Sequence, residues 1–107
     1  MQHIKPAELA QYLADSEKKQ PLLLDVREPW EYETCHIPQA QLMPMHTVPL
    51  RFQELDPEAS IVCVCHHGGR SMQVAHFLER NGFNHIINLT GGVHAWAKEV
   101  DTSMPTY

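Results

Sequence analysis

Three short segments of this sequence have the apolar character of strands that are buried on both faces of a sheet. Proline or glycine stands close to each of them, which restricts each segment to the length of a strand. The segments are residues 21–26, 61–64 and 85–89. Helical patterns separate them, and this alternation predicts an α/β domain with a mostly parallel sheet and right-handed crossovers. In such a sheet, ligands bind beyond the carboxyl ends of the strands.

The predicted helices follow from the spacing of apolar residues and from signals at the helix ends. Pro6 suits the first position of a helix, because its missing N–H would have no partner there. Apolar residues then recur at helical spacing as far as Leu13. The other predicted helices cover residues 29–33, 71–81 and 93–100. Gly82 provides a stop for the second of these, and the proline-rich stretch after residue 33 is predicted to be irregular.

The chain has the size and composition of one folded domain over residues 1–107. Its hydrophobic fraction of 43% and charged fraction of 20% argue against disorder. The formal net charge of -5 argues against a nucleic-acid binder, which would carry a basic patch. No apolar run approaches the roughly 20 residues that cross a bilayer, and the first residues lack the layout of a signal peptide. Three cysteines indicate free thiols in a reducing compartment. Together these observations lead us to expect a cytoplasmic protein without membrane or nucleic-acid partners.

The segment that leaves the second strand carries the residues most suited to chemistry. It runs Cys65-His66-His67-Gly68-Gly69-Arg70-Ser71 and leads through glycines into a helix. The first amides of a helix have no partners within it, and glycines let the N–H groups of a loop converge on one anion. Arg70 adds a permanent cation if its side chain turns inward. These features favour thiolate over thiol at Cys65 and predict a reactive nucleophile, beside which the amides can hold an oxyanion such as thiosulfate.

This loop resembles the C-x-x-G-x-R-S active loop of single-domain rhodaneses. Three further blocks resemble the same family and occur in its order. The family's D-V-R-E…E-Y-E segment is matched by Leu24-Asp25-Val26-Arg27-Glu28 with Glu31-Tyr32-Glu33. Its G-H-I-P-G-A is similar to His36-Ile37-Pro38-Gln39-Ala40, and its L-x-G-G…W to Leu89-Thr90-Gly91-Gly92 with Trp96. The resemblance extends over residues 4–100.

The resemblance implies a rhodanese-like fold, in which a five-stranded, mostly parallel sheet has helices on both faces. It also implies a thiosulfate sulfurtransferase. Cys65 would take a sulfane sulfur from thiosulfate or a similar small-molecule donor and pass it, through a persulfide, to cyanide, a dithiol or a protein thiol. The loop residues expected to bind the donor are His66, His67, Gly68, Gly69, Arg70 and Ser71. Asp25 and Arg27 are expected to brace the sheet end beneath the loop, and no metal or organic cofactor is implied.

Three alternatives compete with sulfur transfer. A Cdc25-type cysteine phosphatase or arsenate reductase would have five residues between cysteine and arginine, whereas only four separate Cys65 from Arg70. A non-catalytic rhodanese-fold binding module would share the fold, but the loop keeps its cysteine, glycine and arginine. A metal site built from Cys63, Cys65, His66 and His67 would have a spacing unlike that of structural zinc sites.

Two further cysteines are expected to be structural. Cys63 lies on the second predicted strand and is expected to be a small core residue. Cys35 stands where the family pattern has glycine. It is expected to be a packed or exposed side chain in an altered turn, with receipt of sulfur from Cys65 as the alternative.

The remaining polar side chains have separate interpretations. His66 and His67 either add positive charge for an anionic donor or contribute only their backbone amides. Ser71 is expected to cap the helix and to offer a hydrogen bond to the anion. Glu31 is assigned to the scaffold, and His94 carries no functional signal.

Overall fold

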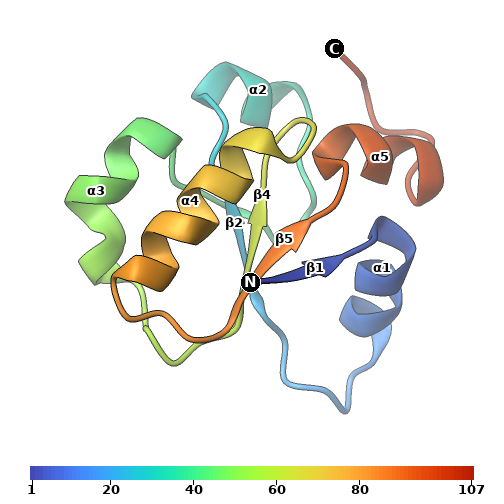
Figure 1. Cartoon of the computed structure of the whole chain (residues 1–107). Helices are drawn as coiled ribbons and strands as arrows, with labels where there is room; N and C mark the ends of the chain where they lie inside the picture. Colours follow the sequence, from blue (N-terminus) through green and yellow to red (C-terminus); the bar gives the residue numbers. More distant parts are fainter.

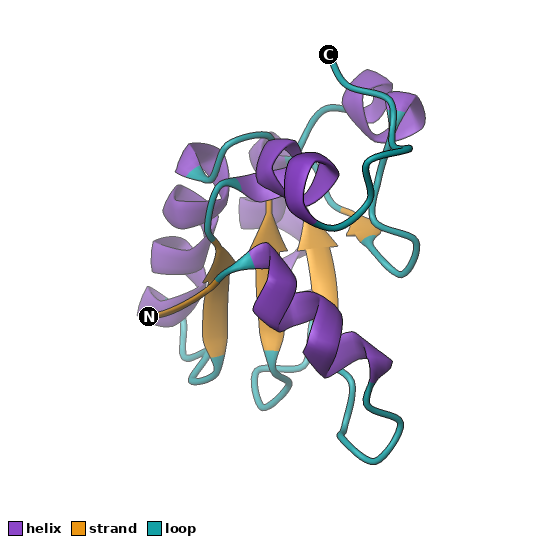
Figure 2. Cartoon of the chain, turned by 90° about the vertical axis from the view of Figure 1, so that its right-hand side faces the viewer, coloured by secondary structure: helices purple, strands orange, loops and turns teal.

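The computed structural model describes residues 1–107 and arranges five strands in a single sheet. Across the sheet their order is β1 (Gln2–Ile4), β5 (Ile86–Leu89), β4 (Ile61–Val64), β2 (Leu22–Asp25) and β3 (Gln41–Leu42). Every neighbouring pair is parallel, and the three central strands point the same way in Figure 2. The predicted α/β class with a five-stranded sheet is confirmed, and the sheet is parallel throughout.

The three predicted strands form the centre of this sheet, with β4 between β5 and β2. All four residues of β4 are at most 1% exposed, as expected for a strand that is covered on both faces. Successive side chains of a strand point to opposite faces. Ile61 and Cys63 therefore pack in one core, and Val62 and Val64 pack in another.

Helices cover both faces of the sheet, as predicted (Figure 1). One face carries α4 (Gly69–Arg80) and α3 (Val48–Arg51), and the other carries α1 (Pro6–Ala14) and α5 (Gly92–Glu99). A short helix, α2 (Pro29–Thr34), follows β2. The bounds of α1, α2, α4 and α5 agree with the predicted ones to within two residues at each end. None of the helices combines the length and the apolar character that crossing a bilayer requires.

The edges of the sheet and the segment before β4 differ from the sequence-based expectation. Strands β1 and β3 were not predicted, because they have only three and two residues and expose most of their side chains. The proline-rich stretch, predicted to be irregular, contains β3 and α3 together with 3-10 turns at Met45–Thr47 and Phe52–Glu54. Proline suits the first turn of α3, where a missing N–H removes no helical hydrogen bond.

The carboxyl ends of all strands meet at one edge, because the sheet is wholly parallel. The register of β2 and β4 places Asp25 opposite Val64. The segment that leaves β2 therefore lies beside the segment that leaves β4 and begins with Cys65. This edge is where a ligand is expected in a parallel sheet.

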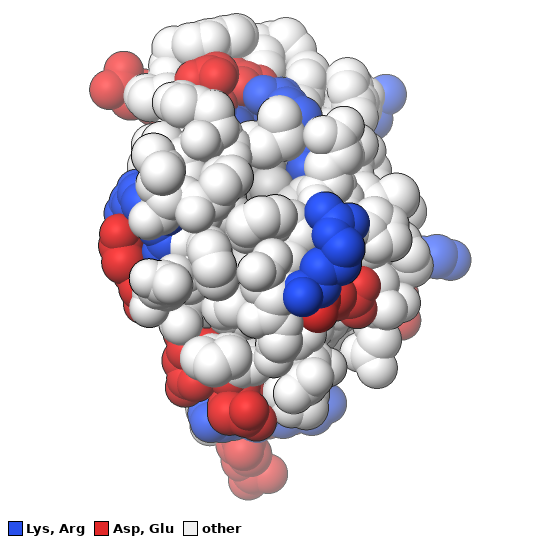
Figure 3. Space-filling model, turned by 60° about the vertical axis from the view of Figure 1, so that its left-hand side comes forward, with Lys and Arg blue, Asp and Glu red and all other residues white.

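The outer surface formed by α3 and α4 is mostly uncharged (Figure 3). Leu50 on α3 is 86% exposed, whereas Leu78 on α4 is 0% exposed in the core beneath it. The two leucines thus offer the same side chain in opposite surroundings.

Replacement of Leu78 by alanine should lower the free energy of unfolding by about 2–5 kcal/mol, because it leaves a cavity in the core. Leu50→Ala removes the same atoms from an exposed position and should change the free energy of unfolding by less than about 0.5 kcal/mol. Urea unfolding followed by circular dichroism measures both values. Equal unfolding midpoints for the two variants would contradict this placement of the core.

Candidate active site

Cys65 directly follows the last residue of β4, at the carboxyl end of the sheet centre. Its sulfur accepts a hydrogen bond from the backbone N–H of Gly68, with an N···Sγ distance of 3.0 Å. Gly68 has a φ of 113°, a conformation that residues with a side chain rarely adopt. The positive φ of Gly68 directs the chain into α4 directly after the amide that reaches the sulfur. Such a donor binds an ionised sulfur more strongly than a neutral thiol.

The sulfur is enclosed by its neighbours. Cys65 is 1% exposed, and its side chain belongs to the core beneath α4. The sequence predicted a nest of several amides around an anion, whereas the hydrogen bond to sulfur comes from Gly68 alone. A donor molecule therefore reaches this sulfur only when neighbouring groups move.

The loop after Cys65 is attached to the first turn of α5. The N–H of Val93 donates to the Cys65 carbonyl oxygen at 2.8 Å, and the N–H of His94 donates to the His66 carbonyl oxygen at 3.0 Å. Gly92 permits this approach, since a Cβ atom there would lie 2.3 Å from the Cys65 oxygen and 2.5 Å from the His66 oxygen. The close approach of the loop therefore requires glycine at position 92, the second glycine of Gly91-Gly92.

Arg70 forms an ion pair with Glu31 of α2. Two guanidinium nitrogens donate to the two carboxylate oxygens, at 2.6 and 2.8 Å. Hydrogen bonding from Arg70 lowers the pKa of Glu31 to about 2, although burial acts in the opposite direction. The predicted cation of the loop is therefore already paired, and its carboxylate partner was not recognised in the sequence beyond a scaffold role.

Tyr107 joins the site from the far end of the sequence. Its hydroxyl donates to Glu31 at 2.8 Å and accepts a hydrogen bond from Arg27 at 2.8 Å. Its ring stacks on His66 with 4.2 Å between the centroids. Burial is the main cause that raises the pKa of Tyr107 to about 12, so the hydroxyl stays protonated at neutral pH. No sequence signal pointed to this residue.

Asp25 and Arg27 form a buried ion pair beneath the loop, at the position where the sequence predicted a brace. The guanidinium donates to both carboxylate oxygens, with its shortest contact at 2.6 Å, and also to the Cys35 carbonyl oxygen at 2.7 Å. Burial alone would lower the pKa of Arg27, but the hydrogen bonds and charge of Asp25 raise it above its ordinary value. Both side chains are 0% exposed, so they act on the site through its framework.

Ser71 does not have the predicted capping role. The helix begins at Gly69, and Gly68 is its N-cap residue. The Ser71 hydroxyl lies 2.5 Å from Oδ1 of Asn88, to which it donates, and both residues are buried. The hydroxyl also lies 3.1 Å from the Gly68 carbonyl oxygen. Its hydrogen bond to an anion stays a prediction, and Asn88 of β5 is a further contact that the sequence did not indicate.

The two histidines of the loop form a cluster with His94. The His66 ring lies next to those of His67 and His94. Burial lowers the pKa of His66, and the two neighbouring imidazoles lower it further, which favours the neutral ring at pH 7. Cys63 lies in the core, where burial raises the pKa of its thiol to about 12. The expectation of a structural Cys63 agrees with this position.

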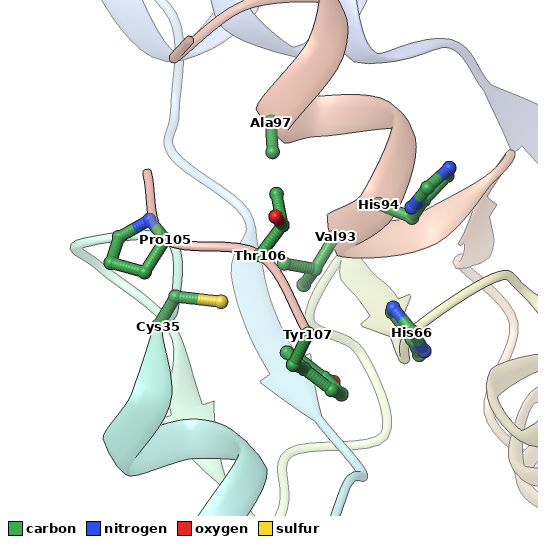
Figure 4. Close-up of a pocket in the computed structure, with 8 residues that line it drawn as sticks. All are labelled: Cys35, His66, Val93, His94, Ala97, Pro105, Thr106 and Tyr107. Atoms are coloured by element: carbon green, nitrogen blue, oxygen red, sulfur yellow. The ribbon is translucent and has the colours of Figure 1, made fainter. Parts of the chain in front are cut away.

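A small cavity of about 10 Å³, the room of roughly one water molecule, lies beside the loop. It is lined by Cys35, His66, Val93, His94, Ala97, Pro105, Thr106 and Tyr107 (Figure 4). The Cys35 sulfur points towards this space in Figure 4. Cys35 packs in the core beneath α1 and α5, whereas Cys65 packs in the other core. Receipt of sulfur by Cys35 stays a prediction.

Comparisons with known proteins agree with the resemblance drawn from the four sequence blocks. A family model described as Rhodanese-like domain matches residues 5–99. A protein named Sulfurtransferase from Allochromatium vinosum is 40% identical over 90 residues, which are 84% of this chain and 82% of that protein. Thiosulfate sulfurtransferase GlpE from Pseudomonas syringae is 33% identical over 91 residues, or 85% and 83% of the two chains. The crystal structure of a rhodanese-like domain protein from Staphylococcus aureus has a TM-score of 0.84 and 36% identity, and covers 94% of this chain and 95% of its own.

Gly92→Ala should lower the free energy of unfolding by at least about 2 kcal/mol, because the new Cβ would strain the backbone and collide with two carbonyl oxygens. Gly69→Ala is the matched control, since a Cβ there meets no atom within 4 Å. It should stay within about 1 kcal/mol of the wild type. Urea unfolding compares the two, and equal stability would contradict the close approach of α5 to the loop.

Glu31→Gln should lower the free energy of unfolding by about 1–3 kcal/mol at pH 7, because Arg70 loses its anionic partner. The folded-state pKa of Glu31, about 2, lies below the ordinary value of 4.5. The carboxylate therefore stabilises the fold fully above about pH 4.5, and this contribution disappears as the pH falls towards 2. Urea unfolding between pH 7 and pH 3 measures the effect, with Glu33→Gln on the exposed side of α2 as the control. A deficit that stayed constant down to pH 3 would contradict the ion pair.

Proposed function

The chain belongs to the rhodanese-like domain family, and from this premise we propose that it is a sulfurtransferase that carries sulfur as a persulfide on Cys65. One observation carries the proposal. Cys65 lies beyond the carboxyl end of the central strand, and the Gly68 amide donates to its sulfur at 3.0 Å. The relative named Sulfurtransferase, which this chain matches over most of its length, supports the reaction class.

The first half-reaction moves the outer sulfur of the donor onto the protein. The Cys65 thiolate attacks the sulfane sulfur of thiosulfate and forms a new S–S bond. The S–S bond of the donor breaks, and its electron pair leaves on sulfite. The product is a Cys65 persulfide with a negative terminal sulfur, and no outside oxidant is needed, because the sulfur arrives in the oxidation state that it keeps.

The second half-reaction returns the cysteine to its starting state. Cyanide attacks the terminal sulfur and leaves as thiocyanate, while the electron pair of the broken S–S bond returns to Cys65. A thiolate acceptor reacts in the same way and leaves as a persulfide. The covalent intermediate thus divides one transfer into two displacements at sulfur.

Hydrogen-bond donors near Cys65, not a net positive charge, suit anionic reactants, because each nearby guanidinium is paired with a carboxylate. A guanidinium has five N–H donors, and the ion pair with Glu31 occupies two of those of Arg70. We infer that the remaining donors of Arg70 bind an anionic donor or the terminal sulfur of the persulfide. The Gly68 amide supplies a second donor close to the reacting sulfur.

Thiosulfate is the donor that we propose, because the GlpE relative bears the name thiosulfate sulfurtransferase and a doubly charged oxyanion matches a loop of backbone amides. A dithiol or a protein thiol is the proposed acceptor in a cell, with cyanide as its laboratory substitute. All three cysteines are free thiols. This suits a reducing compartment such as the cytoplasm.

Wild-type protein mixed with thiosulfate should gain the mass of one sulfur atom and lose it again when cyanide is added. Cys65→Ala should gain no mass and should form thiocyanate at the uncatalysed rate, because the attacking sulfur is absent. Intact-protein mass spectrometry and a colorimetric thiocyanate assay measure the two results.

Cys63→Ala and Cys35→Ala provide the controls, since each removes one of the other thiols. Both should still gain one sulfur from thiosulfate if they remain folded by circular dichroism. Equal thiocyanate rates for wild type and Cys65→Ala would overturn the proposed mechanism. No mass gain in the wild type would instead favour a binding module with the same fold.

A further inference from the structure

Three histidines meet beside the cysteine loop, although the sequence separates them. His66 and His67 come from the loop after β4, and His94 comes from the first turn of α5. One ring nitrogen from each lies within 4.8 Å of those of the other two. The ring centroids are 4.0 Å apart for His66 and His67 and 4.8 Å apart for His67 and His94. The proposed sulfur transfer uses none of these imidazoles.

The backbone holds this histidine cluster together. The N–H of His94 donates to the carbonyl oxygen of His66 at 3.0 Å, which fixes the spacing of the two residues. Tyr107 stacks on the His66 ring and restricts its rotation. His67 is exposed, so its imidazole is free to turn. The His66 ring is thus the most restricted of the three, and the other two are able to adjust to a ligand.

A short movement brings the three nitrogens to coordination distance. Zinc–nitrogen bonds measure about 2.0–2.1 Å, so the nitrogens of a tetrahedral site lie about 3.3 Å apart. The present separations reach 4.8 Å. We expect changes in the side-chain torsions of the exposed His67 and the half-buried His94 to close this difference.

The charges next to the cluster do not exclude a cation. The two nearby guanidinium groups are each neutralised, Arg27 by Asp25 and Arg70 by Glu31. Imidazole is the commonest metal ligand among side chains and suits zinc, copper and nickel. Calcium and magnesium prefer oxygen ligands, which this cluster does not offer.

We propose that His66, His67 and His94 form a binding site for a divalent transition-metal ion of the zinc class. Three imidazoles leave the fourth position of a tetrahedral site open, and a water molecule or an anionic sulfur ligand can fill it. This site differs from the metal site weighed in the sequence, which included Cys63 and Cys65. Cys63 is excluded because it is 0% exposed within the core.

Titration of zinc chloride into the protein, followed by isothermal calorimetry, tests the proposal. The protein carries no affinity tag and is freed of reductant, since both bind zinc. Cys65→Ala serves as the parent, so that the thiolate of the loop cannot hold the ion. We expect the parent to bind one zinc ion per chain.

Two double variants locate the ion. Cys65→Ala/His94→Gln should bind zinc at least about tenfold more weakly than the parent, because loss of even an outer-shell partner costs about 10–100-fold in affinity. Cys65→Ala/His85→Gln is the matched control, since His85 is exposed and precedes β5 at the opposite edge of the sheet. It should bind zinc as the parent does.

Equal zinc affinity in all three proteins would overturn the proposal, and so would an absence of binding in the parent. Circular dichroism checks the fold of each variant. If the His94 variant is unfolded, Cys65→Ala/His67→Asn takes its place, because His67 is exposed. We expect the same loss of zinc affinity for this variant. Sulfur transfer cannot influence these results, because every protein in the series lacks Cys65. A failure of the metal site is therefore distinguishable from a failure of the proposed function.

Discussion

The attachment of the cysteine loop to the first turn of α5 determines where the other parts of the site lie. Two backbone hydrogen bonds hold the carbonyl groups of Cys65 and His66 against α5, and Gly92 leaves the space that this contact requires. With those carbonyls turned towards α5, the amide of Gly68 faces the sulfur. The conformation of the reactive loop is thus imposed by a segment that follows another strand. The same contact brings His94 next to the loop histidines.

A continuous chain of hydrogen bonds crosses the carboxyl end of the sheet near this loop. Asp25 binds Arg27, Arg27 binds the hydroxyl of Tyr107, that hydroxyl binds Glu31, and Glu31 binds Arg70. Two carboxylates balance two guanidinium groups, so the formal net charge of -5 says little about this region. No buried side-chain nitrogen or oxygen lacks a partner. A charged layer of this kind is tolerated in the interior because each charge is paired and hydrogen-bonded.

Sequence patterns were sufficient for the central strands and the main helices, because hydrophobic spacing reports burial and these segments are buried. The edge strands β1 and β3 are held by backbone pairing and have too few side chains to show a pattern. Cys65 was recognised because its glycines and arginine follow it directly. Glu31 and Tyr107 were missed as partners, since they lie 39 positions before Arg70 and 80 positions after Arg27. Ser71 was misassigned because a glycine backbone conformation, not a serine side chain, begins the helix.

The pairing of β1 with β5 has a consequence during translation. Strand β1 is synthesised before the other strands, but it pairs with β5, the last strand of the chain. Gln2 therefore cannot pair with Ile87 until β5 has been made. Until β5 emerges, one edge of β4 also stays unpaired. Contacts between such distant segments form slowly, and an open strand edge invites association with other chains. The nascent domain therefore exposes an unpaired strand edge to other chains until β5 is synthesised.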